Sequence, residues 1–274
     1  MTGGAIEIVR ELTVRGHRIR VAHRPGTGRP LVMCNGIGAS LDLLQPFVDE
    51  LDPSIPVVRF DVPGVGGSPV PRKPYVFATL ATLMGSMLDQ LAYYDVDVLG
   101  ISWGGGLAQQ FAFQNRRRCR RLVLVSTASG WMMVPAHPRV LAKMVTPRRY
   151  RDPDYAKSIA ADIYGGVLRE QPELAKTLLN GHSVISSRRG YLLQLLAASG
   201  WTSTPFLPLI RQPTLILAGL DDPIIPLANA RMMARLMPNA VLETYDDGHL
   251  GLVVKAHELA PRVTAFLRHA DQLR

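Results

Sequence analysis

The sequence predicts an α/β protein built on a doubly wound, mostly parallel β-sheet with an inserted helical cap. Short apolar runs that suit buried strands alternate with longer segments of helical apolar spacing. This alternation is typical of a parallel sheet covered by helices on both faces. The alternation breaks once, in the second half of the chain, and then resumes. A length of 274 residues is sufficient for one large domain with a modest insertion.

The predicted elements follow one another in a regular order. The first two elements are edge strands joined around Gly16. They are predicted as strands because their apolar and polar residues alternate. Buried strands are then expected at residues 31–34, 57–60, 97–101 and 122–125, with helices at 43–51, 77–94 and 105–113; the edge strands cover 6–14 and 18–23. Later strands are expected at 213–219 and 241–245, with helices at 227–237 and 256–269.

The segment from residue 131 to residue 208 differs from the rest of the chain. Its pattern is helical, prolines divide it into short pieces, and it is rich in Trp, Tyr and Met. We expect it to form a helical cap over the carboxyl edge of the sheet. Residues 1–130 and 209–274 would then be the two parts of the core.

The most informative motif is Gly100-Ile101-Ser102-Trp103-Gly104, which lies between a predicted strand and a predicted helix. A strand, a G-x-S-x-G turn and a helix make the nucleophile elbow of an α/β-hydrolase. The turn strains the serine backbone and exposes its hydroxyl, and side chains in place of the glycines would clash with the crossing strand and helix. Ser102 is therefore the predicted nucleophile.

A serine hydroxyl needs a base and a group that orients this base. In this fold an acid and then a histidine follow the serine, on loops after later strands. Of seven histidines, only His249 lies in such a loop. The acid is either Asp221 or Asp222. We favour Asp222 because Pro223 restricts it to an extended conformation that suits a carboxylate projecting toward the histidine loop.

Acyl transfer also needs hydrogen-bond donors for the oxyanion of the tetrahedral intermediate. We expect the backbone N–H groups of Trp103, which follows the nucleophile, and of Ile37, in the loop after the strand at 31–34. The sequence contains no H-E-x-x-H motif, Rossmann fingerprint or complete P-loop, so neither a metal nor a cofactor is expected.

The net charge of +9 reflects 31 Lys and Arg against 22 Asp and Glu, with arginines clustered at 116–118 and 120–121. Such clusters can favour anionic surfaces, but a solvated basic face is the simpler interpretation. No nucleic-acid-binding motif accompanies them, so no nucleic-acid partner is expected.

The expected location is the cytoplasm. The first ten residues lack the apolar core of a signal peptide, and no apolar stretch is long enough for a transmembrane segment. Cys34 and Cys119 fit a reduced compartment, and a disulfide between them is not expected. The sequence does not define an oligomeric state.

Several motifs resemble those of intracellular medium-chain-length polyhydroxyalkanoate (PHA) depolymerases, from about residue 30 to the C-terminus. They lie at residues 34–39, 60–66, 100–105, 221–226 and 246–250 and, within the cap, at 147–150, 163–166 and 200–203. The resemblance implies hydrolysis of storage polyesters with medium-length side chains, at or near storage granules. It also implies Ser102, Asp222 and His249 as a catalytic triad.

A polyester with alkyl side chains needs an apolar channel, and Trp131 and Trp201 near the two ends of the cap are candidate substrate-binding residues. The same triad also suits a capped carboxylesterase, lactonase or C–C bond hydrolase that acts on small hydrophobic substrates. A non-catalytic granule-binding protein is a third alternative, against which the intact serine, acid and histidine argue.

Overall fold

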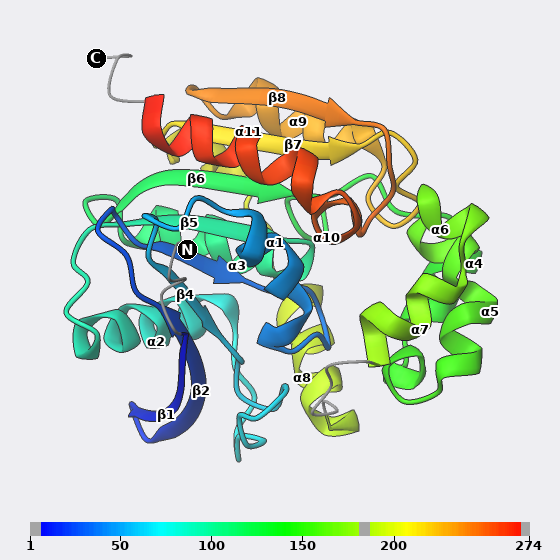
Figure 1. The fold of residues 1–274 in the computed structure, drawn as a ribbon, viewed down its shortest axis with the longest axis horizontal. Helices are drawn as coiled ribbons and strands as arrows, with labels where there is room; N and C mark the ends of the chain where they lie inside the picture. The colour runs from blue at the N-terminus through cyan, green and yellow to red at the C-terminus, as the bar shows by residue number, and fades with distance from the viewer. Residues whose placement is uncertain (1–6, 181–186, 270–274) are drawn as a thin grey trace, which may run out of the picture.

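The structure is a computed structural model that describes residues 7–180 and 187–269 (Figure 1). Within these ranges eight strands form one sheet in the order β1-β2-β4-β3-β5-β6-β7-β8. The β1–β2 and β2–β4 pairs are antiparallel, and all other pairs are parallel. The mostly parallel sheet is therefore confirmed. The strands are β1 (Ile8–Val14), β2 (His17–Arg24), β3 (Leu31–Cys34), β4 (Val57–Phe60), β5 (Val96–Ile101), β6 (Cys119–Val125), β7 (Thr214–Gly219) and β8 (Ala240–Tyr245).

Helices cover both faces of the sheet, with α1 and α11 packed together on one face and α2 and α3 packed together on the other (Figure 1). The α-helices are α1 (Gln45–Glu50), α2 (Phe77–Gln90), α3 (Trp103–Gln114), α4 (Pro138–Met144), α5 (Pro153–Tyr164), α6 (Val167–Glu170), α7 (Glu173–Asn180), α8 (Arg188–Ser199), α9 (Leu227–Leu236), α10 (Gly251–Val254) and α11 (Ala256–His269). The 3₁₀ helices are η1 (Leu41–Leu44), η2 (Pro147–Tyr150) and η3 (Thr204–Leu209).

Element boundaries differ from the prediction where charged or strained residues intervene. Strand β6 begins at Cys119 rather than at 122, because Arg121 is buried and Arg120 pairs with Asp97 of β5 at 2.8 Å. Helix α2 ends at Gln90, before Ala92 adopts a left-handed backbone with φ of 58°. The first predicted strand begins at residue 6, which lies outside the described residues.

The core of the sheet is apolar on both faces, as expected for parallel strands between two helical layers. Every residue of β3, β4, β5 and β7 is buried. Cys34 and Cys119 are buried free thiols, and burial raises the pKa of both above the ordinary value. Across the described ranges we find no helix with the length and apolar character needed to cross a membrane.

Helices α4 to α7 lie beyond the carboxyl ends of the strands (Figure 1). The two ends of this insertion meet, because Gly130 forms a β-bridge with Thr202 and the N–H of Trp131 donates to the carbonyl of Trp201. The division into a core and a cap at residues 131 and 208 stays a prediction.

A buried carboxylate joins β4 to the loops at the carboxyl edge. Asp61 directly follows β4 and accepts hydrogen bonds from the N–H groups of Leu41 and Gly67. Arg20 lies 3.5 Å from the same carboxylate. Burial raises the pKa of Asp61 to about 6, because these favourable contacts do not fully offset the loss of water.

This raised pKa predicts an unusual pH dependence of stability. The native state binds the Asp61 proton more tightly than the unfolded chain does, so this contribution to stability is lost as the pH rises from about 4 to about 6. The loss amounts to at most about 3 kcal/mol. Urea unfolding across this range should show the slope in the wild type and a weaker slope in Asp61→Asn. Equal slopes in the two proteins would contradict the raised pKa.

Candidate active site

Ser102 lies in the turn between β5 and α3 with a backbone φ of 54° and ψ of −122°. Few non-glycine residues adopt this conformation, which is energetically costly. Hydrogen bonds hold it on both sides. The Ser102 N–H donates to the carbonyl of Val125, and its carbonyl accepts from the Gly105 N–H and the Thr127 hydroxyl. The strand–turn–helix arrangement at this serine is the one that the motif predicts.

The glycines of the motif lie where the backbone leaves no room for a side chain. A Cβ at Gly104 would collide with the carbonyl of Cys34 at the end of β3, and one at Gly105 would collide with Thr127. A Cβ at Gly100 would meet the carbonyl of Gly104. The start of α3 can therefore approach the end of β3, and the loop after β3 lies beside Ser102.

His249 and Asp222 form a buried pair, with 2.8 Å between His249 Nδ1 and Asp222 Oδ2. The other carboxylate oxygen of Asp222 accepts the N–H groups of Ile224 and Ile225 at 2.9 Å each. Because the carboxylate engages Nδ1, the other ring nitrogen of His249 is available to a nucleophile. His249 lines the same pocket as Ser102.

Asp221 has a different environment. Its carboxylate is about half exposed, accepts from the Gly166 N–H and pairs with Arg169 at 2.6 Å. The Arg169 guanidinium lowers the pKa of Asp221 below its usual range. Of the two adjacent carboxylates, only Asp222 contacts the histidine, which is the arrangement that Pro223 indicates.

The two predicted oxyanion donors are Ile37, which lines one pocket with Ser102, and Trp103, which follows Ser102 in the chain. In the parts of the chain that are described, the N–H groups of Ile37 and Trp103 donate no hydrogen bond to another group. The loop that carries Ile37 is fixed by the segment at 131–208. The Tyr150 hydroxyl donates to the Ile37 carbonyl at 2.8 Å, and the Gly38 N–H donates to Gln194 Oε1 at 2.8 Å. The sequence contains no signal for Gln194, and the motif at 147–150 does not by itself indicate the role of Tyr150.

Two pockets border Ser102. The first, called the oxyanion pocket here, is lined by the loop after β3, Ser102 and His249, and by Met144, Arg149, Tyr150 and Tyr164 from the insertion. The second, called the apolar pocket, has a lining that includes Phe77, Trp103, Met133, Trp201 and Ile225. A substrate held at Ser102 can therefore extend in two chemically different directions.

The structure treats the two predicted substrate-binding tryptophans differently. Trp201 lies in the apolar pocket, where its ring packs edge-on against Phe77 at 4.8 Å and its Nε1 donates to Gln110. Trp131 is 63% exposed and lines neither pocket. Its backbone lies at the junction, as expected, but its side chain does not turn toward the site.

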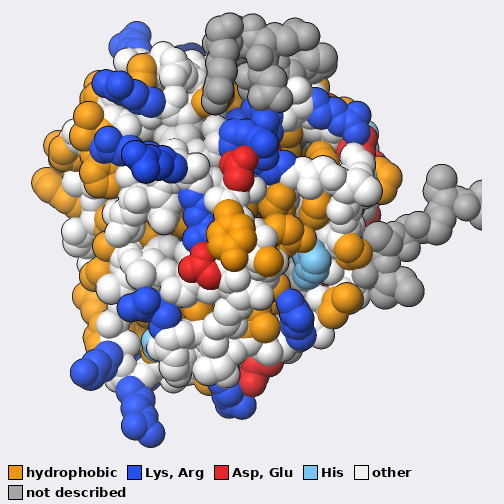
Figure 2. Space-filling view, turned by 90° about the vertical axis from the view of Figure 1, so that its left-hand side faces the viewer, with side chains coloured by type: hydrophobic (Ala, Val, Ile, Leu, Met, Phe, Trp, Pro, Cys, Tyr) orange, Lys and Arg blue, Asp and Glu red, His pale blue; other side chains and the backbone are white. Residues whose placement is uncertain are grey.

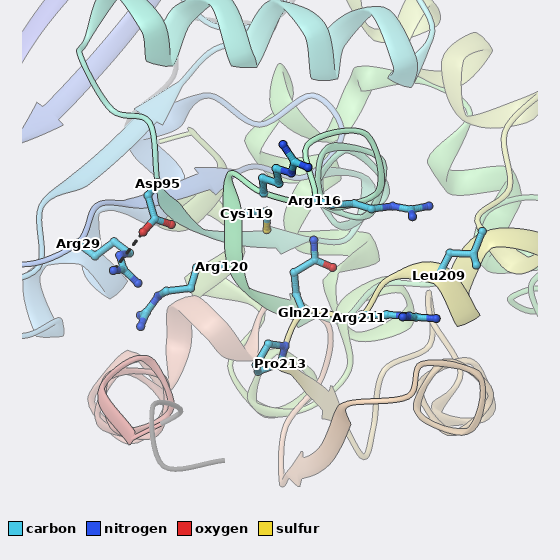
Figure 3. A pocket seen from close by; sticks show the side chains of 10 residues that line it. Arg29, Asp95, Arg116, Cys119, Arg120, Leu209, Arg211, Gln212 and Pro213 are labelled. Carbon is cyan, nitrogen blue, oxygen red and sulfur yellow. Dashed lines mark ion pairs between the residues drawn. The ribbon is translucent and has the colours of Figure 1, made fainter. Parts of the chain in front are cut away.

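A third pocket lies at the other end of the sheet and is lined mainly by arginines (Figure 3). It adjoins the amino ends of β5, β6 and β7, and its arginines are Arg29, Arg116, Arg117, Arg120 and Arg211. Basic side chains are scattered over this face, with few acidic ones among them (Figure 2). The residues that line this pocket include neither a serine nor a histidine, and the predicted triad lies at the opposite edge of the sheet. No group of three or more His, Cys, Asp or Glu suited to a metal gathers anywhere in the described ranges.

The contrast between the two aspartates predicts unequal effects of matched substitutions. Asp222→Asn should reduce kcat by roughly 10⁴-fold, because the amide favours the wrong histidine tautomer. Asp221→Asn should cost less than about tenfold, because an exposed ion pair contributes little. Steady-state kinetics on a p-nitrophenyl ester would measure both. A larger loss in Asp221→Asn would reverse the assignment.

Comparisons with known proteins agree with this geometry. A family model described as the alpha/beta hydrolase fold matches residues 29–256. The chain is 50% identical over 268 residues to a poly(3-hydroxyalkanoate) depolymerase of Ectopseudomonas oleovorans, covering 97% of this chain and 94% of that protein. It is 28% identical to a 2-hydroxymuconate semialdehyde hydrolase of Pseudomonas putida, covering 97% and 96%. The crystal structure of an enol-lactonase from Burkholderia xenovorans LB400 shares the fold, with a TM-score of 0.82 at 23% identity, covering 94% of this chain and 99% of that one. The chain belongs to the α/β-hydrolase fold family.

Proposed function

We propose that this protein is a serine ester hydrolase that cleaves poly(3-hydroxyalkanoate) with medium-length side chains. The buried His249–Asp222 pair beside the strained Ser102 carries the proposal of ester hydrolysis. The polyester substrate is supported by the 50% identity to the depolymerase of Ectopseudomonas oleovorans, which extends through the insertion at 131–208. A cytoplasmic location at the granule surface is part of the same proposal.

The mechanism follows from the positions of the side chains. Ser102 Oγ attacks the ester carbonyl while His249 takes its proton, and Asp222 stabilises the resulting imidazolium. The oxyanion accepts hydrogen bonds from the N–H groups of Ile37 and Trp103. The alcohol then leaves with the proton from His249, and an acyl-enzyme remains. Water, deprotonated by His249, attacks the acyl-enzyme and releases the acid and Ser102.

The apolar pocket supports the preference for medium-length side chains. Its aromatic and aliphatic lining offers no charged group to an alkyl chain. Each additional methylene group buried there is worth about 0.8 kcal/mol. Longer alkyl side chains should therefore bind more tightly, up to the length that the pocket accepts.

Hydrolysis of small esters, lactones or C–C bonds is the second candidate function. Relatives with these activities share the fold, as the Pseudomonas putida hydrolase and the Burkholderia xenovorans enol-lactonase illustrate. The small free volume of about 20 Å³ in the oxyanion pocket favours this alternative, because it leaves little room for a polymer chain beside Ser102.

Hydrolysis of purified polyester latex distinguishes these functions. We expect acid release from octanoate-type polymer to exceed that from butyrate-type polymer, because the longer side chain fills the apolar pocket. Ser102→Ala should abolish release and also covalent labelling by a serine-directed phosphonate. Cleavage of soluble esters without release from either polymer would reject the depolymerase function and retain the hydrolase.

Trp201, which lines the apolar pocket, and Trp131, which does not, provide a test variant and its control. Trp201→Ala should reduce polymer turnover about tenfold more than turnover of a short p-nitrophenyl ester, because only the polymer places an alkyl side chain against the indole. Trp131→Ala should leave the ratio of the two rates unchanged. Equal losses on both substrates in Trp201→Ala would show that this residue supports the fold rather than the polymer.

A further inference from the structure

Arg149 is a buried cation in the wall of the oxyanion pocket. It lies in η2 and is only 1% exposed. Its guanidinium lies over the rings of Tyr150 and Tyr191, with 4.7 Å and 5.5 Å from Cζ to the ring centroids. Its Nη1 donates to the Tyr191 hydroxyl at 2.9 Å.

No carboxylate of the described chain pairs with this guanidinium. The groups close enough to influence its charge are Tyr150, Tyr164 and Tyr191. The Nε of Arg149 is buried and has no acceptor, and the same holds for the Nε of the equally buried Arg59. The other nitrogens of Arg59, however, donate to the carboxylate of Glu7, the Gln45 side chain and a carbonyl. Arg149 therefore differs from a structural buried arginine in lacking an anion.

An unpaired charge in this position is costly. Burial alone lowers the pKa of Arg149, but the surrounding tyrosines raise it, and the net pKa lies above the ordinary value. The guanidinium thus remains charged. Cation–π contacts with two rings offset part of the free energy of hydration that burial removes. They do not replace the hydrogen bonds that an anionic partner would accept. A buried cation with free donors is suited to an anionic ligand.

A second donor lines the same pocket. The Tyr164 hydroxyl is buried, has no hydrogen-bond partner within the ordinary limits of distance and angle, and lies close enough to Arg149 for the guanidinium to act on its pKa. Burial raises the pKa of Tyr164, so the phenol stays protonated and able to donate. The backbone carbonyl of Tyr164 accepts the N–H of His249, which ties this residue to the catalytic base. Arg149 and Tyr164 thus offer donors beside the reacting groups.

We infer that Arg149, assisted by Tyr164, binds the free carboxylate of the terminal 3-hydroxyacid unit, so that the enzyme acts at the carboxyl end of its substrate. This inference rests on the proposed function. A carboxylate fits the observations because it accepts two hydrogen bonds from one guanidinium.

The chemistry of the substrate places this carboxylate close to the scissile ester. In the terminal unit, only two carbons separate the ester oxygen from the carboxylate, so a substrate whose ester lies at Ser102 keeps its carboxylate beside the reacting groups. Ser102 Oγ bonds to the acyl carbon, the C–O bond to the terminal unit breaks, and the freed hydroxyl receives its proton from His249. The released 3-hydroxyacid carries its carboxylate on Arg149, while the acyl unit extends into the apolar pocket.

The test compares two substrates that differ in this charge and in one methyl group, and it follows cleavage of the internal ester bond that both contain. They are the dimer of 3-hydroxyoctanoate as the free acid and as its methyl ester, assayed where the carboxyl is ionised. We expect the wild type to prefer the free acid by about 10-fold to 100-fold in kcat/KM. Arg149→Met should bring this ratio close to one. Arg149→Lys should retain part of the preference, since it keeps the charge but loses the bidentate geometry.

Arg148→Met is the matched control, because Arg148 precedes Arg149 in η2 and its side chain is 61% exposed. It should keep the wild-type ratio. Equal wild-type rates on the acid and the methyl ester would overturn the inference, whether or not Arg149→Met folds. The proposed function would survive this result, provided that Ser102→Ala abolishes hydrolysis of both dimers. Absence of hydrolysis of either dimer by the wild type would overturn the inference, and acid release from the polymer latex would still decide the proposed function.

Discussion

The close approach of helix α3 to the end of strand β3 is the constraint on which the site depends. It requires glycine at position 104, whose missing side chain lets the helix backbone reach the carbonyls of Cys34 and Asn35. The same approach holds Ser102 at a φ of 54°, a conformation that costs on the order of 1–3 kcal/mol. Hydrogen bonds from Gly105 and Thr127 to the Ser102 carbonyl hold this backbone, and the predicted nucleophile lies beside the loop that carries Ile37.

The insertion at 131–208 completes this unit from the opposite side. Tyr150 fixes the carbonyl of Ile37, and Gln194 fixes the N–H of Gly38. The backbone carbonyl of Gln194 accepts the indole N–H of Trp103 at 2.8 Å, so one residue contacts both halves of the proposed oxyanion hole. Residues that line the pockets therefore also support the expected catalytic groups, and a change in one of them affects both binding and turnover.

The parts of the site that could be predicted from the sequence have local signals. The glycine pattern around Ser102, the position of His249 after a late strand and the restriction of Asp222 by Pro223 each depend on a few neighbouring residues. The mostly parallel sheet and its helical layers follow in the same way from the alternation of apolar runs. The contacts of Tyr150 and Gln194 with the oxyanion loop have no such signal, since 113 and 156 residues separate the partners.

Two differences between expected and observed side-chain exposure have a common physical cause. Trp131 was expected at the site because it adjoins the junction of the insertion, but position along the chain fixes the backbone and leaves the side chain free to face water. The basic cluster at 116–121 was expected to be a solvated face, yet Arg121 is buried. In both cases the exposure of the side chain depends on which residues from distant parts of the chain pack against it. The local sequence pattern does not identify those residues.

The chemical difference between the two pockets gives the proposed enzyme two kinds of selectivity. The apolar pocket adds about 0.8 kcal/mol for each methylene group, so its selectivity for side-chain length is graded. The oxyanion pocket contains the buried charge of Arg149. A substrate with a carboxylate would accept its hydrogen bonds and a substrate without one would not, so the difference in binding between the two is large. Ser102 lies between the two pockets. The groups on both sides of the ester bond would therefore contact the enzyme before the bond is cleaved. Length discrimination on the acyl side can thus vary among related enzymes without altering recognition on the side of the leaving group.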